Sequence, residues 1–118
     1  MSKVDILFLN NKAMEELGCG DMAAVMHDVE RAYTLVEQGD VITPGKLPMR
    51  WGKTAEDENV YGRINAMPGY IGGEYNMAGI KWIGSGPMNY KKGLPRASVT
   101  VILNDPDTKL PVCVADGT

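Results

Sequence analysis

Histidine and cysteine are scarce in this sequence, which has one histidine, His27, and two cysteines, Cys19 and Cys113. A single histidine excludes a metal site built from several histidines of this chain. Helical spacing places His27 on the polar side of its segment, so we interpret it as a solvated surface residue. The two cysteines match no metal-ligand spacing, which favours two buried thiols in a reducing cytoplasm. We therefore predict a cytoplasmic protein without a metal centre.

Long hydrophobic runs and clustered positive charge are also missing. No apolar stretch approaches the roughly 20 residues that span a bilayer. The N-terminal segment MSKVDILFLNNK has neither the basic region nor the cleavage site of a signal peptide. The net charge is −3 and the basic residues are scattered, so no nucleic-acid-binding surface is indicated. We expect neither a membrane nor a nucleic-acid partner.

A complete nucleotide-binding loop is absent as well. The segment GSGPMN at residues 84–89 lacks the third glycine of the dinucleotide motif G-x-G-x-x-G, and no Walker A loop is found. We therefore predict that this chain alone binds no NAD(H).

What the sequence does have is the composition of a soluble globular protein, with 44% hydrophobic and 23% charged residues. Its 118 residues favour a single domain. The apolar pattern predicts an α+β fold, in which a strand and two helices precede a mainly antiparallel sheet. Strands are predicted at residues 4–9, 47–51, 60–68, 75–84, 97–104 and 110–115. Turns are predicted at Pro68-Gly69 and at NDPDTK, and the second should join the last two strands in a hairpin.

The two predicted helices lie near the N-terminus. Asn10 or Asn11 caps the first helix, which ends at Gly18. Asp21 caps the second, which runs to Gln38. Apolar residues at helical spacing predict that one face of the second helix is buried, and they are Met22, Val25, Met26, Val29, Tyr33 and Val36.

Two basic residues stand within apolar strand patterns. Lys81 lies in GIKWIGSGP, on the strand face opposite to Ile80 and Trp82. An unpaired ammonium is costly to bury, so Lys81 must reach solvent or face an anion, and nearby glycines would leave room for a ligand. Arg50 in LPMRW poses the same question, and a guanidinium with an ammonium forms a receptor for a carboxylate. Two alternatives remain open: an edge-strand lysine that prevents aggregation, and a surface ion pair for Arg50.

The order of the segments PMR, NAMPGYIGG, AGIKWIGSGP and KKGLPRASVTVILNDPDTKLPVCVADGT resembles the ornithine cyclodeaminase/mu-crystallin family. The resemblance is greatest to the tyramine oxidase members of this family, and it is most specific from Met67 onward. It implies that residues 1–118 are a partial substrate-binding and dimerisation domain at the N-terminus of a longer enzyme. It also implies a Rossmann domain for NAD or NADP after residue 118, and a homodimer.

The resemblance also implies roles for individual residues. Arg50 and Lys81 would bind the substrate carboxylate, with Lys81 as the catalytic candidate close to the reacting carbon. Asn65 and Met67 would lie in the substrate site. Asn65 replaces a glutamate of ornithine cyclodeaminases, which removes a possible base. Arg96 stands where relatives have a serine or threonine near the cofactor, so it is the cofactor-binding candidate.

The function implied by the resemblance is hydride transfer at the nitrogen-bearing carbon of an amino or imino acid. Both a cyclodeaminase, which is a lyase, and a reductase of cyclic or open imines use this chemistry. The loss of the glutamate at position 65 favours the oxidoreductase. The alternative is a non-catalytic module that binds a small molecule or dimerises and has no nucleotide domain.

Overall fold

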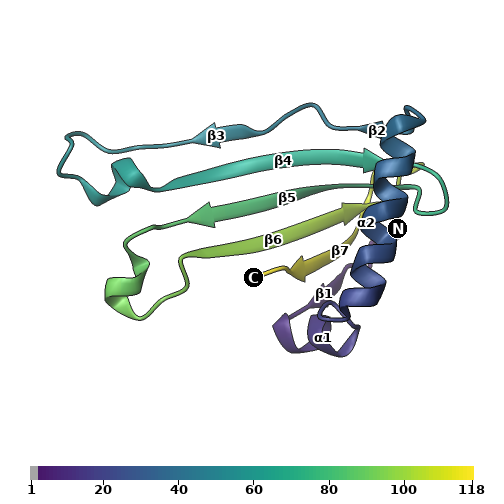
Figure 1. Cartoon of the computed structure of the whole chain (residues 1–118), viewed down its shortest axis with the longest axis horizontal. Helices are drawn as coiled ribbons and strands as arrows, with labels where there is room; N and C mark the ends of the chain where they lie inside the picture. The colour runs from purple at the N-terminus through teal and green to yellow at the C-terminus, as the bar shows by residue number, and fades with distance from the viewer. Residues whose placement is uncertain (1–2) are drawn as a thin grey trace.

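One large sheet dominates the structure, a computed structural model that describes residues 3–118 (Figure 1). Its strand order is β1-β7-β6-β5-β4-β2, and β3 also pairs with β4. All pairs are antiparallel except β1 with β7. The strands are β1 (Leu7–Leu9), β2 (Val41–Ile42), β3 (Leu47–Met49), β4 (Arg63–Ile71), β5 (Met77–Ser85), β6 (Ala97–Asn104) and β7 (Pro111–Asp116). The helices are α1 (Asn11–Glu16) and α2 (Met22–Glu37), with short 3-10 turns η1 (Glu58–Tyr61) and η2 (Asn89–Lys92). The predicted α+β architecture is confirmed.

Both helices begin and end where the capping residues predict. The Asn10 side-chain oxygen accepts a hydrogen bond from the Ala13 amide at 2.9 Å. The Asp21 carboxylate accepts two hydrogen bonds from the first-turn amides of α2 at 3.1 and 3.2 Å. Gly18 and Gly39 follow the helices with φ of +92° and +76°, a conformation that glycine adopts without strain. Among residues 3–118, neither α1 nor α2 has the length and hydrophobicity that a membrane-spanning helix requires.

The hairpin of β4 and β5 is longer than predicted. β4 continues through Pro68 and Gly69, so the turn predicted there is wrong. The chain turns at residues 72–76 instead, where the Asn76 amide donates to the Gly72 carbonyl at 3.2 Å. Pro68 is tolerated because it lies between the part of β4 that pairs with β3 and the part that pairs with β2. On this edge no partner strand requires the N–H that proline lacks. β2 was not predicted, since two residues carry no periodic signal.

The predicted hairpin of β6 and β7 is confirmed. Its turn is held by the Asp105 carboxylate, which accepts hydrogen bonds from the amide and hydroxyl of Thr108 at 2.7 and 2.8 Å. Both bonds lower the pKa of Asp105 below its ordinary value, and the bond from the Thr108 amide has the larger effect.

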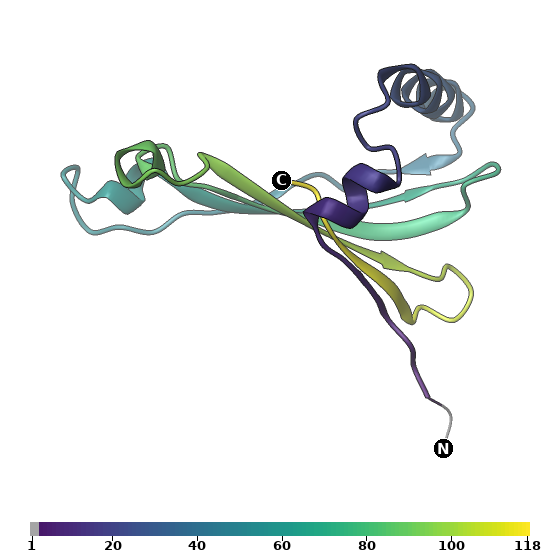
Figure 2. The same cartoon turned by 90° about the horizontal axis from the view of Figure 1, so that it is seen from below.

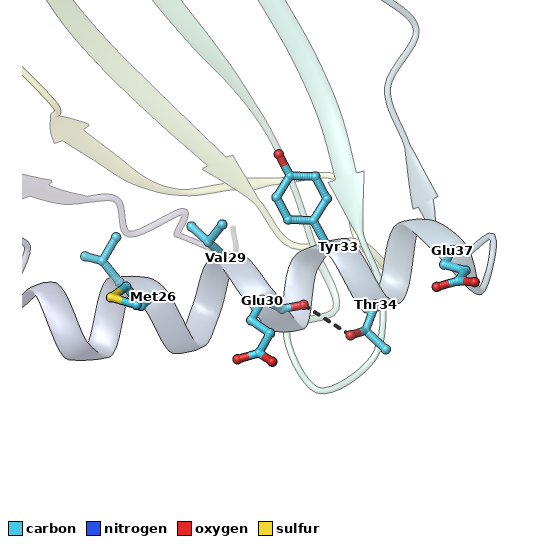
Figure 3. A pocket seen from close by; sticks show the side chains of 7 residues that line it. Met26, Val29, Glu30, Tyr33, Thr34 and Glu37 are labelled. Carbon is cyan, nitrogen blue, oxygen red and sulfur yellow. Dashed lines mark hydrogen bonds between the residues drawn. The ribbon is translucent and has the colours of Figure 1, made fainter.

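The apolar stripe of α2 is exposed, so its predicted burial is wrong within this chain. Met26 and Tyr33 are 65% and 72% exposed, and with Val29 they project from one side of the helix (Figure 3). The buried residue is Leu35, at 1% exposure, which was not assigned to the stripe. It packs against Gly73, where an added Cβ would lie 2.8 Å from the leucine side chain. α2 therefore rests on the β4–β5 turn with a different side from the one that the sequence predicts.

Polar contacts fasten α2 to the same turn. The Arg31 guanidinium binds the Glu74 carboxylate at 2.8 Å, and the Tyr75 hydroxyl donates to the Asp28 carboxylate at 2.7 Å. Figure 2 shows both helices on one side of the sheet, with α2 reaching over only one end of it. Most of the sheet is therefore left without a second layer within residues 3–118.

Few large side chains are buried in the described residues. Besides Leu35, the buried hydrophobic residues are Cys113 and Ala115 on β7, the strand that α1 contacts. The prediction of a buried thiol is confirmed for Cys113 and wrong for Cys19, which is exposed. Cys19 lies in the short connection between α1 and α2.

Candidate functional site

The register of the sheet brings several predicted site residues to one face. Met67 on β4 pairs with Lys81 on β5, and directly paired residues of antiparallel strands share a face. Asn65 pairs with Pro48, and Arg50 lies two residues beyond Pro48. We call the face with Arg50, Arg63, Asn65, Met67 and Lys81 the cationic face.

The opposite side of the same strands is apolar. Ala66 pairs with Trp82, and Ile80 pairs with Ile102. We call the face with Ile64, Ala66, Ile80, Trp82 and Ile102 the apolar face. The predicted separation of Lys81 from Ile80 and Trp82 is confirmed by this register.

Lys81 lies on an interior strand. β5 is paired with β4 on one side and β6 on the other, so the interpretation of Lys81 as an edge-strand lysine is wrong. Its side chain is exposed, because nothing in the described chain covers the cationic face at this point. It lines an apolar cavity of about 310 Å³ together with Met67 and residues of β5 and β6.

Gly79 has a structural reason to be glycine. A Cβ at this position would lie 2.5 Å from the Ile102 carbonyl oxygen, which is closer than real Cβ atoms approach backbone. This glycine therefore permits the close approach of the β6 backbone, and because it also lines the cavity that Lys81 borders, its role in leaving room for a ligand stays a prediction.

A second cavity, of about 320 Å³, opens beside β3 and β4. It is lined by Lys46, Pro48, Arg50, Arg63 and Asn65. Arg50 and Lys81 thus border different cavities on the same face, and Asn65 and Met67 lie between them along β4. Among the side chains described at residues 3–57 and 59–118, no carboxylate lies within ion-pair distance of Arg50 or Lys81, so the surface ion pair considered for Arg50 is not seen with any of them.

Asn65 is the buried polar residue of this face. The residue is 7% exposed, and its Oδ1 atom is buried without a hydrogen-bond partner among the described residues. Buried polar atoms are nearly always paired, so this oxygen is suited to accept a hydrogen bond from a ligand N–H.

Arg63 and Lys46 were missed by the sequence analysis. Each lies an even number of residues from a predicted site residue, Arg63 from Asn65 and Lys46 from Arg50. Strand alternation is the signal that could have found them, because every second side chain shares a face.

The structure does not bring Arg96 to the rest of the site. Arg96 immediately precedes β6, five residues before Val101, which is the partner of Lys81. Its carbonyl accepts a hydrogen bond from the Gly86 amide at 2.8 Å, which closes the β5–β6 connection. Its role in cofactor binding stays a prediction.

The glycines of the β5–β6 connection do not fit a dinucleotide. Gly86 leads into η2, which has four residues, whereas a pyrophosphate site needs a glycine-rich turn that opens a longer helix. Within residues 3–118, no three histidine, cysteine or acidic side chains gather as metal ligands.

Comparison with known proteins defines the family. Residues 6–118 match the ornithine cyclodeaminase/mu-crystallin family. The chain belongs to this family. The closer likeness to its tyramine oxidase members stays a prediction.

One curated relative resembles the chain in sequence, and two solved structures resemble it in both sequence and fold. N-((2S)-2-amino-2-carboxyethyl)-L-glutamate dehydrogenase of Staphylococcus aureus is 36% identical over 113 residues, which are 95% of this chain and 33% of the relative. An archaeal alanine dehydrogenase, solved as a dimer with bound NAD, is 35% identical at a TM-score of 0.78, over 96% of this chain and 31% of its own. Thermococcus litoralis Δ1-pyrroline-2-carboxylate reductase, solved with NADH and L-proline, is 31% identical at a TM-score of 0.83, over 96% of this chain and 32% of its own. The chain thus spans about a third of the length of these relatives.

Proposed function

We propose that this chain is the substrate-binding part of an NAD(P)-dependent enzyme that interconverts an amino acid and the corresponding imino acid. The observation that carries the proposal is the cationic face, where Arg50 and Lys81 lie on the same side as the unpaired Oδ1 atom of Asn65. Family membership supports it, because the named relatives act on amino or imino acids.

Each residue has a distinct task in this proposal. Arg50 binds one substrate carboxylate through its planar fork, and Lys81 adds a movable positive charge beside the nitrogen-bearing carbon. The Asn65 oxygen accepts a hydrogen bond from the substrate nitrogen, and Met67 provides an apolar contact next to Lys81. A neutral amide at position 65 cannot serve as a carboxylate base, which supports an oxidoreductase rather than a lyase.

The nicotinamide nucleotide would be held outside these residues. Because the β5–β6 connection does not fit a dinucleotide, we propose a Rossmann domain encoded after residue 118, with residues 1–118 as a partial substrate-binding and dimerisation domain. The nucleotide would exchange a hydride with the nitrogen-bearing carbon. Arg96 is the candidate for contact with it. Titration of the isolated chain with NADH should leave the nucleotide fluorescence unchanged, and micromolar binding would contradict this domain assignment.

The reaction is tested in the full-length protein that carries this chain. Formation of reduced nicotinamide is followed while amino acids are offered with NAD or NADP. Arg50→Lys keeps the charge and removes the fork, so kcat/KM should fall by roughly tenfold, the low end expected for one charge-assisted contact. Lys12→Gln removes an exposed charge on α1, far from the site in sequence and strand order, and should leave kcat/KM unchanged. If no amino or imino acid reacts with either nucleotide, the proposal is wrong.

A second candidate is a module that binds a small molecule or dimerises without catalysis. The lack of a dinucleotide loop in this chain favours it. Amino-acid binding without turnover in the full-length protein would support this candidate over the enzyme.

Self-association belongs to both candidates. We propose a homodimer, because most of the sheet has no second layer within this chain and an uncovered apolar sheet face is rarely left to solvent. The archaeal relative solved as a dimer supports this expectation.

A further inference from the structure

The cavity beside β3 and β4 carries more positive charge than one carboxylate can balance. Three of its lining residues are cations, Lys46, Arg50 and Arg63, and none is acidic. Lys81 adds a fourth cation on the same face. The α-carboxylate of an amino acid brings one negative charge, so the proposed function leaves Arg63 and Lys46 without a task.

Among the side chains that the structure describes, at residues 3–57 and 59–118, no carboxylate pairs with these cations. The basic residues that do form ion pairs there are Lys3, Lys12, His27 and Arg31, and none of them borders the cavity. Arg50 and Arg63 line the same cavity, and each directly adjoins one member of the last pair of the ladder, Met49 with Ile64. Like charges at facing positions of neighbouring strands repel each other. An anionic ligand between the two guanidinium groups would remove this repulsion.

Asn65 provides an independent indication that the cavity receives a ligand. It lines the same cavity, its side chain is more than nine-tenths buried, and its Oδ1 atom is unpaired. A ligand with both an N–H group and carboxylates would satisfy the amide and the cations together.

We infer that the substrate is an amino or imino acid with a second carboxylate, and that Arg63, assisted by Lys46, binds this second carboxylate. Arg63 is half-buried, which lowers the screening of its charge, and its fork can bind a carboxylate through two hydrogen bonds. Lys46 is exposed and contributes a flexible charge at the rim. The inference rests on the proposed function only for the amino-acid character of the ligand.

Matched ligands separate the second carboxylate from the rest of the molecule. L-Glutamate and L-glutamine, like L-aspartate and L-asparagine, differ in one carboxylate that is replaced by an amide. Calorimetric titration of the full-length protein without nucleotide should show at least about tenfold tighter binding of the dicarboxylic member of a pair, the value expected for one charge-assisted contact. Inorganic phosphate serves as a competitor, and a site that prefers phosphate to every dicarboxylate would overturn the inference.

Variants then assign the preference to Arg63. Arg63→Gln should abolish the preference for the dicarboxylic ligand and leave binding of the amide ligand unchanged. Arg63→Lys keeps the charge without the fork, so it should retain a smaller preference. If Arg63→Gln does not fold, Lys46→Gln is measured instead, because its position is exposed and tolerates substitution. Lys46→Gln should also reduce the preference for the dicarboxylic ligand. Lys12→Gln removes the same net charge on α1 and should change nothing.

The outcomes distinguish this inference from the proposed function. Equal binding of both members of every pair, or equal weakening of both by Arg63→Gln, would overturn the inference even if the enzyme oxidises amino acids. A dicarboxylate preference that depends on Arg63, without any turnover with NAD or NADP, would support the inference and contradict the proposed reaction.

Discussion

On β3, β4 and β5, the cationic face and the apolar face of the sheet are built from residues that are neighbours in sequence. Three basic residues of one face each adjoin an apolar residue of the other: Arg50 adjoins Met49, Arg63 adjoins Ile64, and Lys81 adjoins Trp82. The cationic face also holds the unpaired Oδ1 atom of Asn65, whereas the apolar face of these strands carries no charged side chain.

The comparison teaches that one sheet can present two kinds of surface without any second layer of its own. Charges that lack a protein partner are suited to a small anion. Apolar side chains without cover are suited to another protein surface. Substitutions at adjacent positions can therefore test each face separately on the same strand.

The largest expected effect is on the cationic face. Lys81→Met keeps the side-chain length and removes the charge, so kcat/KM of the full-length enzyme should fall roughly ten- to a hundredfold. The melting temperature should stay the same or rise, because an uncompensated charge is lost. Trp82→Phe, one residue along, should keep kcat/KM near the wild-type value. Near-wild-type kinetics for Lys81→Met would remove this lysine from the site.

The second effect is on the apolar face. Trp82 is 43% exposed in the isolated chain, and Trp82→Lys would place a charge in the proposed dimer contact. Burial of an unpaired ammonium is costly, so self-association should weaken at least about tenfold. Sedimentation velocity at several protein concentrations measures it, with Lys81→Met as the control that should not dissociate the dimer. A wild-type chain that stays a compact monomer at these concentrations would contradict the proposed dimer.

The smallest expected effect is on the stability of the contact between α2 and the β4–β5 turn. α2 is bound to this turn and covers neither the cationic face nor the apolar face. The hydrogen bond from Arg31 lowers the pKa of Glu74 below its ordinary value of 4.5. A lowered pKa in the folded state means that the ion pair stabilises the fold above pH 4.5 and that this contribution is lost as pH falls through the folded pKa. We expect a small loss of thermal stability in that acidic range.

Glu74→Gln is the variant that tests the ion pair. It should lower stability slightly at neutral pH and flatten the pH dependence in the acidic range. Thermal unfolding of both proteins as a function of pH measures the difference. Parallel pH profiles would show that Glu74 does not cause the change.

Much of the secondary structure followed from local signals. Asn10 and Asp21 cap helices because their side-chain oxygens reach the free first-turn amides, an interaction that needs no distant residue. The β6–β7 turn likewise depends on Asp105 and residues that directly follow it. The Pro68-Gly69 turn was predicted wrongly. Proline interrupts a strand where a partner strand requires a backbone N–H donor, and β2 and β3 leave the edge of β4 at Pro68 unpaired.

The candidate site was predictable only in part. Arg50 and Lys81 stood out as basic residues within apolar strand patterns, and family likeness added Asn65 and Met67. The register places Asn65, Met67 and Lys81 on one face, and Arg50 continues the alternation of β3 one residue beyond the strand. Arg63 was missed because the alternation that puts it on the same side as Asn65, within the strand predicted at residues 60–68, was not followed. The exposure of Tyr33 on α2 was also missed, since helical periodicity marks an apolar face without showing whether anything covers it.

By itself, the sequence determined that Lys81 lies on the face opposite to Ile80 and Trp82, because side chains alternate along any extended strand. It also determined the caps of both helices. The tertiary structure alone decided that Lys81 stands beside Met67, that Arg50 and Arg63 border one cavity, and that Asn65 is buried with an unpaired oxygen. These relations depend on the register between strands that are distant in sequence, which long-range pairing sets and local backbone preference cannot.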